Sequence, residues 1–346
     1  MSQELRVGVL GAGMIANAHM KGYEIIPAVK VVAVSDVLTE RAQDFARRYN
    51  IPRVYGDYRE LLEATDIDAV SVCLPVFMHA PATIDALEAG KHVLCEKPMA
   101  LNAQEAQEMV DTAEKTGKKL MVYWRRRFSP EARRAKEIID SGELGNIYYC
   151  KTIRYRFRGR PGFDATMQNF GRWFMDKDKA GGGALMDIGG YDLDVTLGLI
   201  GFPAIGAVSC STYQEIDKEK AAAKGVSVEE LALGFIRTVT GVTVWLETAF
   251  AINGPQQNET FFFGSEGGLS LSPLKIYKPV WYCGKEPIAI EPDIPAQYPT
   301  AQECFVDSVM NDKPIPISSG KEALYIAKLQ DALYESARSG REIKLQ

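Results

Sequence analysis

The fold of the first part of the chain is decided by residues 5–16, which read Leu-Arg-Val-Gly-Val-Leu-Gly-Ala-Gly-Met-Ile-Ala. The apolar run 5–10 predicts a buried strand, and the residues that follow the glycines predict a helix. Gly11 permits a tight turn, Gly13 lets the backbone approach a pyrophosphate, and Ala16 lets the helix pack closely on the strand. This order predicts a dinucleotide site, with the phosphates at the N–H groups of the helix N-terminus.

Further apolar runs alternate with helical patterns up to residue 123. Strands are expected over residues 31–35, near Val54, and over 69–74, 93–95 and 120–123. Helices are expected over 39–49, from about residue 80, and after Asn102, which is an N-cap with Glu105 three residues on and Gly117 as the stop. Six strands alternating with helices predict a doubly wound parallel sheet.

The second of these strands ends at Asp36, twenty-three residues after Gly13. A carboxylate in that place accepts a hydrogen bond from a ribose 2′-hydroxyl and repels a 2′-phosphate. Arg41 is the nearby cation that could accommodate NADP instead. The predicted cofactor is therefore NAD, with NADP as the second choice.

The segment Glu96-Lys97-Pro98 follows the apolar run 92–95. Ligands of open parallel sheets bind beyond the carboxyl ends of the strands, and Pro98 restricts the backbone of Lys97. Lys97 is therefore a candidate to bind a substrate hydroxyl and to stabilise the alkoxide that forms before hydride leaves. A surface lysine beside a turn proline is the simpler alternative for this pair taken alone.

From residue 147 the pattern changes to period two. Strands are expected over residues 148–157, 204–213, 231–239, 242–251, 259–264 and 274–282. Without helices between them, they predict a largely antiparallel open sheet. Val244 and Leu246 share one face and Trp245 the other, so one face should pack on helices and the other on a partner subunit. The charged stretch Glu215–Lys224 is expected to be a solvated loop.

A second glycine-rich stretch, 181–194, reads Gly-Gly-Gly-Ala-Leu-Met-Asp-Ile-Gly-Gly-Tyr-Asp-Leu-Asp. Its leading glycines are expected to form a turn where the backbone approaches a ligand. Asp187, Tyr191 and Asp194 follow at i, i+4 and i+7, so they should share one face of a helix. That face is either solvated or part of a site. The two glycines inside the helix each weaken it by about 1 kcal/mol, so we expect close packing there.

These motifs, in this order, resemble the Gfo/Idh/MocA family of glucose–fructose oxidoreductases and inositol dehydrogenases, and the resemblance spans nearly the whole chain. It is carried by residues 11–16, Asp36, Pro75 with His79 four residues later, Glu96-Lys97-Pro98, Trp173, the stretch 181–194, and the segments 317–323 and 334–337. The resemblance implies an NAD-binding Rossmann domain, 1–126, and an α+β domain, 127–346, which binds substrate and forms oligomer contacts through its open sheet.

The resemblance also implies roles for individual residues. Lys97 and Tyr191 would be the acid–base pair and Asp187 would orient the substrate, although family members usually carry histidine where this chain has Tyr191. The bond before Pro98 would be cis. Cofactor contacts would come from Gly11, Gly13, Met14, Ile15, Asp36, Leu74, Pro75, His79, Glu96 and Trp173.

Two arginine clusters are left with open roles. Arg154, Arg156 and Arg158 alternate along the strand 148–157. They either bind a carboxylated or phosphorylated sugar, with Arg156 as a substrate residue, or form salt bridges on a solvent face. The cluster Arg125–Arg127 is expected to mix structural ion pairs with contacts on the cofactor side.

Composition bounds the class of protein. A chain of 346 residues is expected to form two domains, and a net charge of −5 argues against nucleic acid as a partner. No apolar stretch reaches the roughly eighteen residues that span a bilayer, and no secretory signal precedes the first strand. Six scattered cysteines suggest a reducing cytoplasm, and the three histidines lie in no metal-ligand spacing, so no metal is expected.

The predicted function is reversible hydride transfer between NAD and a secondary hydroxyl of a sugar, glycoside or cyclic polyol, by a homodimer or homotetramer. Two alternatives keep most of the motifs. A glycosidase or lyase of this fold would oxidise a sugar carbon transiently, eliminate the neighbouring group and take the hydride back. A non-enzymatic NAD or sugar sensor would bind without turnover, and the intact Lys97-Pro98 argues against it.

Overall fold

Strand and helix alternate in the first part of the chain to form a parallel sheet, and a second sheet follows. The computed structural model describes residues 4–167, 171–280 and 286–345. The chain divides into a first unit, Met1–Arg125 with Pro299–Ala327, and a second unit, Arg126–Tyr298 with Lys328–Gln346. The sequence predicts a single boundary after residue 126. It does not show that Pro299–Ala327 belongs to the first unit.

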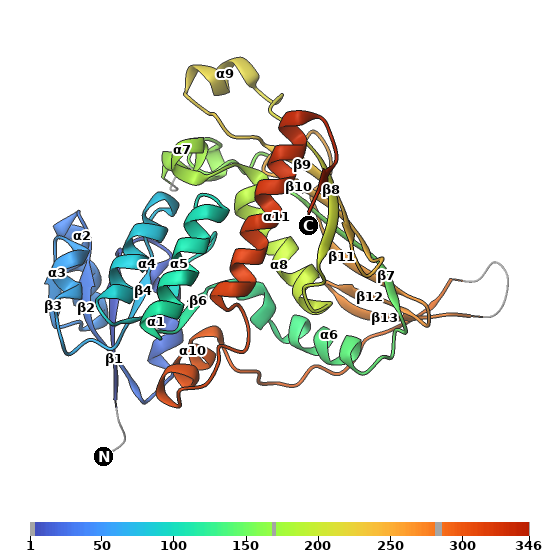
Figure 1. The fold of residues 1–346 in the computed structure, drawn as a ribbon. Helices are drawn as coiled ribbons and strands as arrows, with labels where there is room; N and C mark the ends of the chain where they lie inside the picture. The colour runs from blue at the N-terminus through green and yellow to red at the C-terminus, as the bar shows by residue number, and fades with distance from the viewer. Residues whose placement is uncertain (1–3, 168–170, 281–285, 346) are drawn as a thin grey trace. The chain divides into compact units, whose positions relative to one another are not determined.

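The sheet of the first unit has the order β3-β2-β1-β4-β5-β6 with every pair parallel, which confirms the doubly wound prediction (Figure 1). Its strands are Leu5–Leu10 (β1), Val29–Ser35 (β2), Arg53–Tyr55 (β3), Ala69–Val72 (β4), His92–Cys95 (β5) and Leu120–Val122 (β6). Strands β4 and β6 are buried throughout, because a sheet with helices on both faces has no solvent side.

The helices of the first unit are Ala16–Glu24 (α1), Thr39–Tyr49 (α2), Tyr58–Leu62 (α3), His79–Glu88 (α4), Ala103–Thr116 (α5) and Ala301–Met310 (α10). Helix α5 has both predicted caps: the Asn102 side chain accepts the N–H of Glu105, and Gly117 is left-handed with φ 65°. Helix α3 has no counterpart among the expected elements, because five residues are too few to show a period.

The sheet of the second unit has the order β14-β13-β12-β11-β7-β10-β9-β8-β15. Its strands are Ile147–Tyr155 (β7), Ile205–Tyr213 (β8), Leu231–Thr238 (β9), Thr243–Ala249 (β10), Gln257–Gly264 (β11), Gly268–Leu271 (β12), Leu274–Lys278 (β13), Ile288–Ile290 (β14) and Ile343–Lys344 (β15). Strands β7 and β10 pair in parallel and the other described pairs are antiparallel, as predicted. The strand expected over 274–282 ends at Lys278, and its last two residues, 281 and 282, lie outside the described residues. Cys283 also lies outside them.

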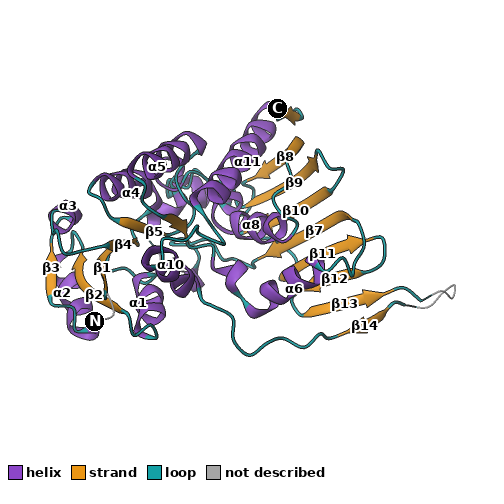
Figure 2. Ribbon diagram, turned by 60° about the horizontal axis from the view of Figure 1, so that its bottom comes forward, coloured by secondary structure: helices purple, strands orange, loops and turns teal. Residues whose placement is uncertain are grey.

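The helices of the second unit are Pro130–Asp140 (α6), Lys177–Ala180 (α7), Gly190–Leu199 (α8), Lys218–Ala223 (α9) and the last part of Gly320–Ser339 (α11). Figure 2 shows α6 and α8 against one face of the sheet. Val244 and Leu246 are fully buried, whereas Trp245 is half-buried and donates from Nε1 to Glu247 (2.6 Å). The predicted division of β10 into two faces is confirmed.

The prediction of a solvated loop over Glu215–Lys224 is confirmed for solvent exposure, since most of these residues are exposed, and wrong for the loop. The segment contains helix α9, and the Ala221 side chain is fully buried. Upstream of the helix, the N–H groups of Glu215 and Ile216 both donate to the Glu230 carboxylate (2.8 and 2.5 Å). The charge pattern alone did not show this order, because the partner carboxylate lies just before β9, fourteen and fifteen residues further along the chain.

Across residues 4–167, 171–280 and 286–345, no helix is both long and apolar enough to cross a membrane. The same residues contain no group of three or more His, Cys, Asp or Glu side chains that could hold a metal ion. Cys73, Cys95 and Cys150 are buried thiols.

Candidate active site

The turn between β1 and α1 is shaped to receive an anion. Gly11 has φ +94°, and a Cβ there would lie 2.5 Å from the carbonyl oxygen of Cys73, so only glycine fits. A Cβ at Gly13 would meet nothing within 4 Å. Just before α1, the N–H groups of Gly13, Met14 and Ile15 donate to no acceptor among the described residues. N–H groups at a helix start attract phosphate, so this turn fits a pyrophosphate.

Asp36 closes β2 beside this turn with a buried carboxylate. One oxygen accepts the Ala12 N–H (2.9 Å) and Nε of Arg41 (2.8 Å). The other accepts the Leu38 N–H (2.9 Å) and Nη2 of Arg41 (2.7 Å). Because a carboxylate offers about four lone-pair sites, Arg41 occupies positions that a ribose hydroxyl would use. A bound ribose must therefore displace part of this ion pair.

A cavity of about 710 Å³ opens next to this ion pair, and Gly13, Leu38, Arg41 and Arg48 are among the residues that line it. Arg48 donates to Oδ1 of Asn17 (3.0 Å) and is a second cation in the cavity wall. Sequence reasoning considered Arg41 alone. The spacing of seven residues on α2 could have found Arg48, because i and i+7 lie on one helical face.

Replacing Arg41 by glutamine is expected to raise the preference for NAD over NADP about tenfold, because the change removes a cation that can bind a 2′-phosphate. Quenching of protein fluorescence measures the dissociation constant of each dinucleotide. Arg47→Gln is the control, since Arg47 pairs with Asp44 at the surface of the same helix and does not line the cavity. An unchanged ratio of the two constants would remove Arg41 from the choice of cofactor.

Lys97 follows β5 at the carboxyl edge of the first sheet, as predicted. The Glu96 N–H donates to the carbonyl of Val72 (3.0 Å), so pairing with β4 continues up to the lysine. The Lys97–Pro98 bond is cis, as the resemblance implied. Because β1, β4 and β5 are neighbours in the sheet, the turns that follow these three strands share one edge. The residues of these turns that were predicted for the site are partly or fully exposed: Met14, Ile15, Leu74, Pro75 and Lys97.

Two residues expected at the cofactor instead have buried side chains that bind the protein itself. The Glu96 carboxylate accepts from Nε2 of His19 (2.9 Å) and from the Lys97 N–H (3.1 Å). The His79 ring nitrogens contact the carbonyl oxygens of Leu74 (2.8 Å) and Pro98 (2.7 Å), and burial lowers the pKa of this imidazole. Glu96 and His79 therefore hold the turns after β4 and β5 in shape.

In the second unit, Asp187 and Tyr191 lie on a helix that begins with the π-helical turn Leu185–Gly189 and continues as α8. Between residues 182 and 199 these two side chains alone are partly exposed. Asp194, expected on the same face, is fully buried and pairs with Arg127 (3.4 Å). A π-helical turn has i→i+5 hydrogen bonds, so the regular helical spacing assumed for all three residues does not hold, and Asp194 is structural.

The glycines before this helix make room for the protein's own groups rather than for a ligand. A Cβ on Gly182 would lie 2.0 Å from the Tyr334 hydroxyl, and one on Gly183 would lie 1.9 Å from the Glu229 carbonyl oxygen. The Glu229 carboxylate accepts from the N–H groups of Gly183 and Leu185 (2.9 Å each) and from the Tyr334 hydroxyl (2.9 Å). Glu229 thus caps the helix that carries Asp187 and Tyr191, a role that sequence reasoning missed.

Three of the six arginines in the two clusters, Arg126, Arg127 and Arg154, pair with carboxylates of α8. Asp192, buried on α8, accepts hydrogen bonds from Arg126 and from Nη2 and Nε of Arg154 (2.8 and 3.0 Å). Arg126 and Arg154 therefore anchor the helix next to Tyr191. The alternative for Arg154 is confirmed in its salt bridge and wrong in its solvent face, because the partner carboxylate is buried inside the unit.

Arg156 differs from its neighbours. Its guanidinium lies 5.9 Å from the centre of the Phe250 ring and forms no hydrogen bond or ion pair with the described residues. Burial lowers the pKa of this guanidinium, and the Asp187 carboxylate opposes that shift. Arg156 is thus a half-buried cation close to Asp187.

Trp173 lies in the short 3₁₀ turn Arg172–Met175 of the second unit. Its ring stacks on that of Phe174 with centroids 3.8 Å apart. Phe174 in turn packs against the buried cluster that includes Ile188 and Phe250. The Trp173 ring is thus connected, through Phe174, to the buried cluster against which the helix of Asp187 packs.

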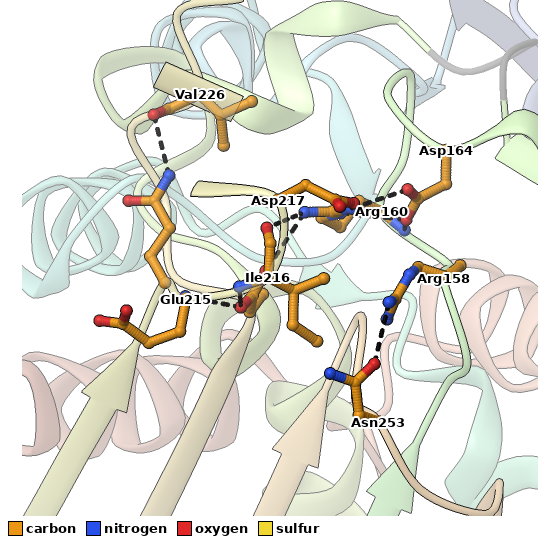
Figure 3. Close-up of polar contacts among 10 residues, drawn as sticks. Arg158, Arg160, Asp164, Glu215, Ile216, Asp217, Val226 and Asn253 are labelled. Carbon is orange, nitrogen blue, oxygen red and sulfur yellow. Dashed lines mark hydrogen bonds and ion pairs between the residues drawn. The ribbon is translucent and has the colours of Figure 1, made fainter. Parts of the chain in front are cut away.

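A buried arginine holds the loop that follows β7 (Figure 3). Arg160 makes two bonds to Asp164 (3.0 and 2.9 Å), one to Asp217 (2.9 Å) and one to Glu230 (3.3 Å). It also donates to the Ile216 carbonyl (2.9 Å). The network ties the loop to the segment before α9, and sequence reasoning missed it because its members are scattered along the chain.

Replacing Arg160 by methionine is expected to lower the free energy of unfolding by about 3–5 kcal/mol, because two buried carboxylates lose their counter-ion. Urea denaturation followed by circular dichroism measures the change. Arg237→Met is the control, since its pair with Glu342 is exposed and contributes at most about 1 kcal/mol. Equal shifts for the two variants would mean that the Arg160 network stabilises the fold no more than an exposed ion pair does.

Comparison with known proteins identifies the family. Residues 5–124 match an oxidoreductase family with an NAD-binding Rossmann fold, and residues 132–270 match the GFO/IDH/MocA C-terminal domain. The chain belongs to the GFO/IDH/MocA family of oxidoreductases. The predictions of family, fold and NAD-binding domain are therefore confirmed.

Relatives within the GFO/IDH/MocA family extend over the whole chain. The D-glucoside 3-dehydrogenase of Escherichia coli (strain K12) is 34% identical over 99% of this chain and 98% of its own. The levoglucosan dehydrogenase of Pseudarthrobacter phenanthrenivorans is 29% identical over 77% of this chain and 73% of its own. Among solved structures, the aldose-aldose oxidoreductase of Caulobacter crescentus complexed with glycerol covers 99% of this chain and 100% of its own, with 25% identity and a TM-score of 0.84.

Proposed function

We propose that this protein transfers hydride reversibly between NAD and a secondary hydroxyl of a sugar, glycoside or cyclic polyol. The observation that carries the proposal is the position of Lys97, which follows β5 at the ligand-binding edge of an NAD-binding sheet. The full-length match to a D-glucoside 3-dehydrogenase supports a glycoside as the substrate class.

Lys97 and Tyr191 share the handling of the substrate oxygen in this proposal. Tyr191 takes the hydroxyl proton during oxidation and returns it during reduction. The Lys97 ammonium donates a hydrogen bond to the same oxygen, stabilises the developing alkoxide, and favours the phenolate form of Tyr191 by its charge. The nicotinamide, when bound, accepts the hydride or returns it.

Two further residues orient the substrate. Asp187 is the carboxylate left partly exposed on the helix of Tyr191, and it can accept a hydrogen bond from a second hydroxyl of a polyol. Arg156 lies near Asp187 and can donate to a ring or hydroxyl oxygen. Both types of contact suit an oxygen-rich carbohydrate.

The test is the near-ultraviolet absorbance of NADH when the purified protein meets NAD and a panel of inositols, hexoses and alkyl glycosides. Growth of absorbance with one class supports the dehydrogenase and identifies the substrate class. No net growth with any substrate, together with cleaved glycosides in the same tubes, would indicate hydride recycling by a glycosidase or lyase. No growth and no cleavage would indicate a sensor.

The open face of the second sheet supports self-association as a homodimer or homotetramer. Aromatic rings lie close together on this face: Tyr149 and Phe263 of the neighbouring strands β7 and β11 stack at 5.2 Å, Phe261 and Tyr277 lie 6.3 Å apart across β12, and Phe235 and Trp245 of β9 and β10 lie 6.0 Å apart. Aromatic rings are enriched where protein surfaces associate, so a second copy of the chain is the partner that this face suits.

A further inference from the structure

A chain of hydrogen-bonded buried polar side chains in the first unit ends at Glu96, the residue before Lys97. The Tyr23 hydroxyl bonds to Oγ of Ser71 (2.9 Å), and the same Oγ bonds to Nδ1 of His19 (3.0 Å). Nε2 of His19 bonds to Oε1 of Glu96 (2.9 Å). His19 and Ser71 are 0% exposed and Glu96 is 4% exposed. Burying four polar side chains is costly unless each one is paired, and here each one is.

The direction of the hydrogen bonds in this chain follows from the donors present. Burial raises the pKa of the Tyr23 phenol, so its O–H donates to Ser71. The Ser71 hydroxyl then donates to Nδ1 of His19, and Nε2–H of His19 donates to the Glu96 carboxylate. In this arrangement every hydrogen has an acceptor, and Nε2 is the nitrogen of His19 that faces the Glu96 carboxylate.

Glu96 connects this chain to the lysine. Its second oxygen, Oε2, accepts the backbone N–H of Lys97 (3.1 Å). On the other side of the strand end, the Tyr123 N–H donates to the Cys95 carbonyl (2.8 Å), and the Tyr123 ring packs on His19 with centroids 4.8 Å apart. The N–H of Lys97 is therefore held by the Glu96 carboxylate, and that carboxylate is oriented by the His19 imidazole.

We propose that His19 is a positioning residue for the reaction: through Glu96 it fixes the backbone from which the Lys97 ammonium reaches the substrate oxygen. The proposal rests on the proposed function, in which Lys97 contacts that oxygen. His19 lies on α1, seventy-eight residues before Lys97, and touches neither substrate nor cofactor in this role. Misplacement of a catalytic group by about 1 Å can cost roughly 10²-fold in rate, which gives a positioning residue a measurable effect.

Two isosteric substitutions separate the bond to Glu96 from the bond to Ser71. In His19→Gln the side-chain amide nitrogen reaches the place of Nε2 and can still donate to Glu96. In His19→Asn the amide reaches only the place of Nδ1, so Glu96 loses its donor. We expect His19→Asn to have a kcat about tenfold lower than that of His19→Gln, with equal dissociation constants for NADH and a lower urea midpoint for His19→Asn, because the buried Glu96 carboxylate loses its donor.

The position of the lysine is read directly by trace labelling with acetic anhydride, followed by peptide mass spectrometry. Lys97 is expected to label faster in His19→Asn than in wild type or in His19→Gln, because its backbone is released. Lys91, whose ammonium donates to the Ala64 carbonyl (2.7 Å), is the internal reference. Equal labelling of Lys97 in both variants would overturn the proposal, and this readout needs no substrate.

A double-mutant cycle with Lys97→Met separates this inference from the proposed function. If His19 acts through Lys97, then His19→Asn lowers kcat in the wild-type background and has no further effect once the lysine is gone. Additive losses in the cycle would show that His19 does not act through Lys97 and only stabilises the fold. A Lys97→Met enzyme with normal turnover would instead refute the proposed function itself.

Discussion

Replacing Lys97 by methionine is expected to lower kcat about 10²–10⁴-fold, the usual contribution of a positioned proton-handling group. The variant loses the cation that stabilises the substrate alkoxide, and it keeps the length and most of the volume of the side chain. NAD binding is expected to be unchanged, because the glycine turn follows β1 and Asp36 follows β2, whereas Lys97 follows β5. Initial rates of NADH formation and the dissociation constant of NADH measure the two effects.

Two controls make the Lys97 result specific. Lys21→Met removes an exposed lysine of the same unit and should leave kcat unaltered. Lys97→Arg keeps the positive charge and should recover part of the activity, although a guanidinium presents its donors differently from an ammonium. Turnover of Lys97→Met within a few-fold of wild type would refute the central role of this lysine.

Replacing Tyr191 by phenylalanine is expected to lower kcat by a similar factor, about 10²–10⁴, because the proton of the substrate hydroxyl loses its acceptor. The change should have little effect on stability, because Tyr191 is partly exposed. Tyr213→Phe, at an exposed tyrosine of the same unit, is the control. A Tyr191→Phe enzyme that retains wild-type kcat would assign proton transfer to another group.

The pH dependence provides a second test of Tyr191. A phenol in water titrates near ~10 and an imidazole near ~6.5. A base must be deprotonated to act, so oxidation by the tyrosine enzyme should accelerate toward alkaline pH. In Tyr191→His the rise should occur at lower pH. A rate of oxidation that already reaches its plateau by about pH 6 would contradict a tyrosine base.

The sequence by itself determined most of the first unit. The glycine turn at residues 11–13, helix α2 over Thr39–Tyr49, and the two caps of α5 follow from signals contained within a few neighbouring residues. Such signals act through local dihedral preference and through N–H groups that need a nearby acceptor. Asp36 and Lys97 were found for the same reason, since both lie where a buried strand ends.

Only the tertiary structure decided which charged side chains belong to the site and which hold the fold. Glu96 turns inward to His19, seventy-seven residues away, and Asp194 turns to Arg127, sixty-seven residues away. Arg160 binds Glu230 at a separation of seventy residues. Isolated from their partners, these residues look like any polar residue near a motif. A buried charge takes its role from the partner that packing brings to it, and no local period encodes that partner.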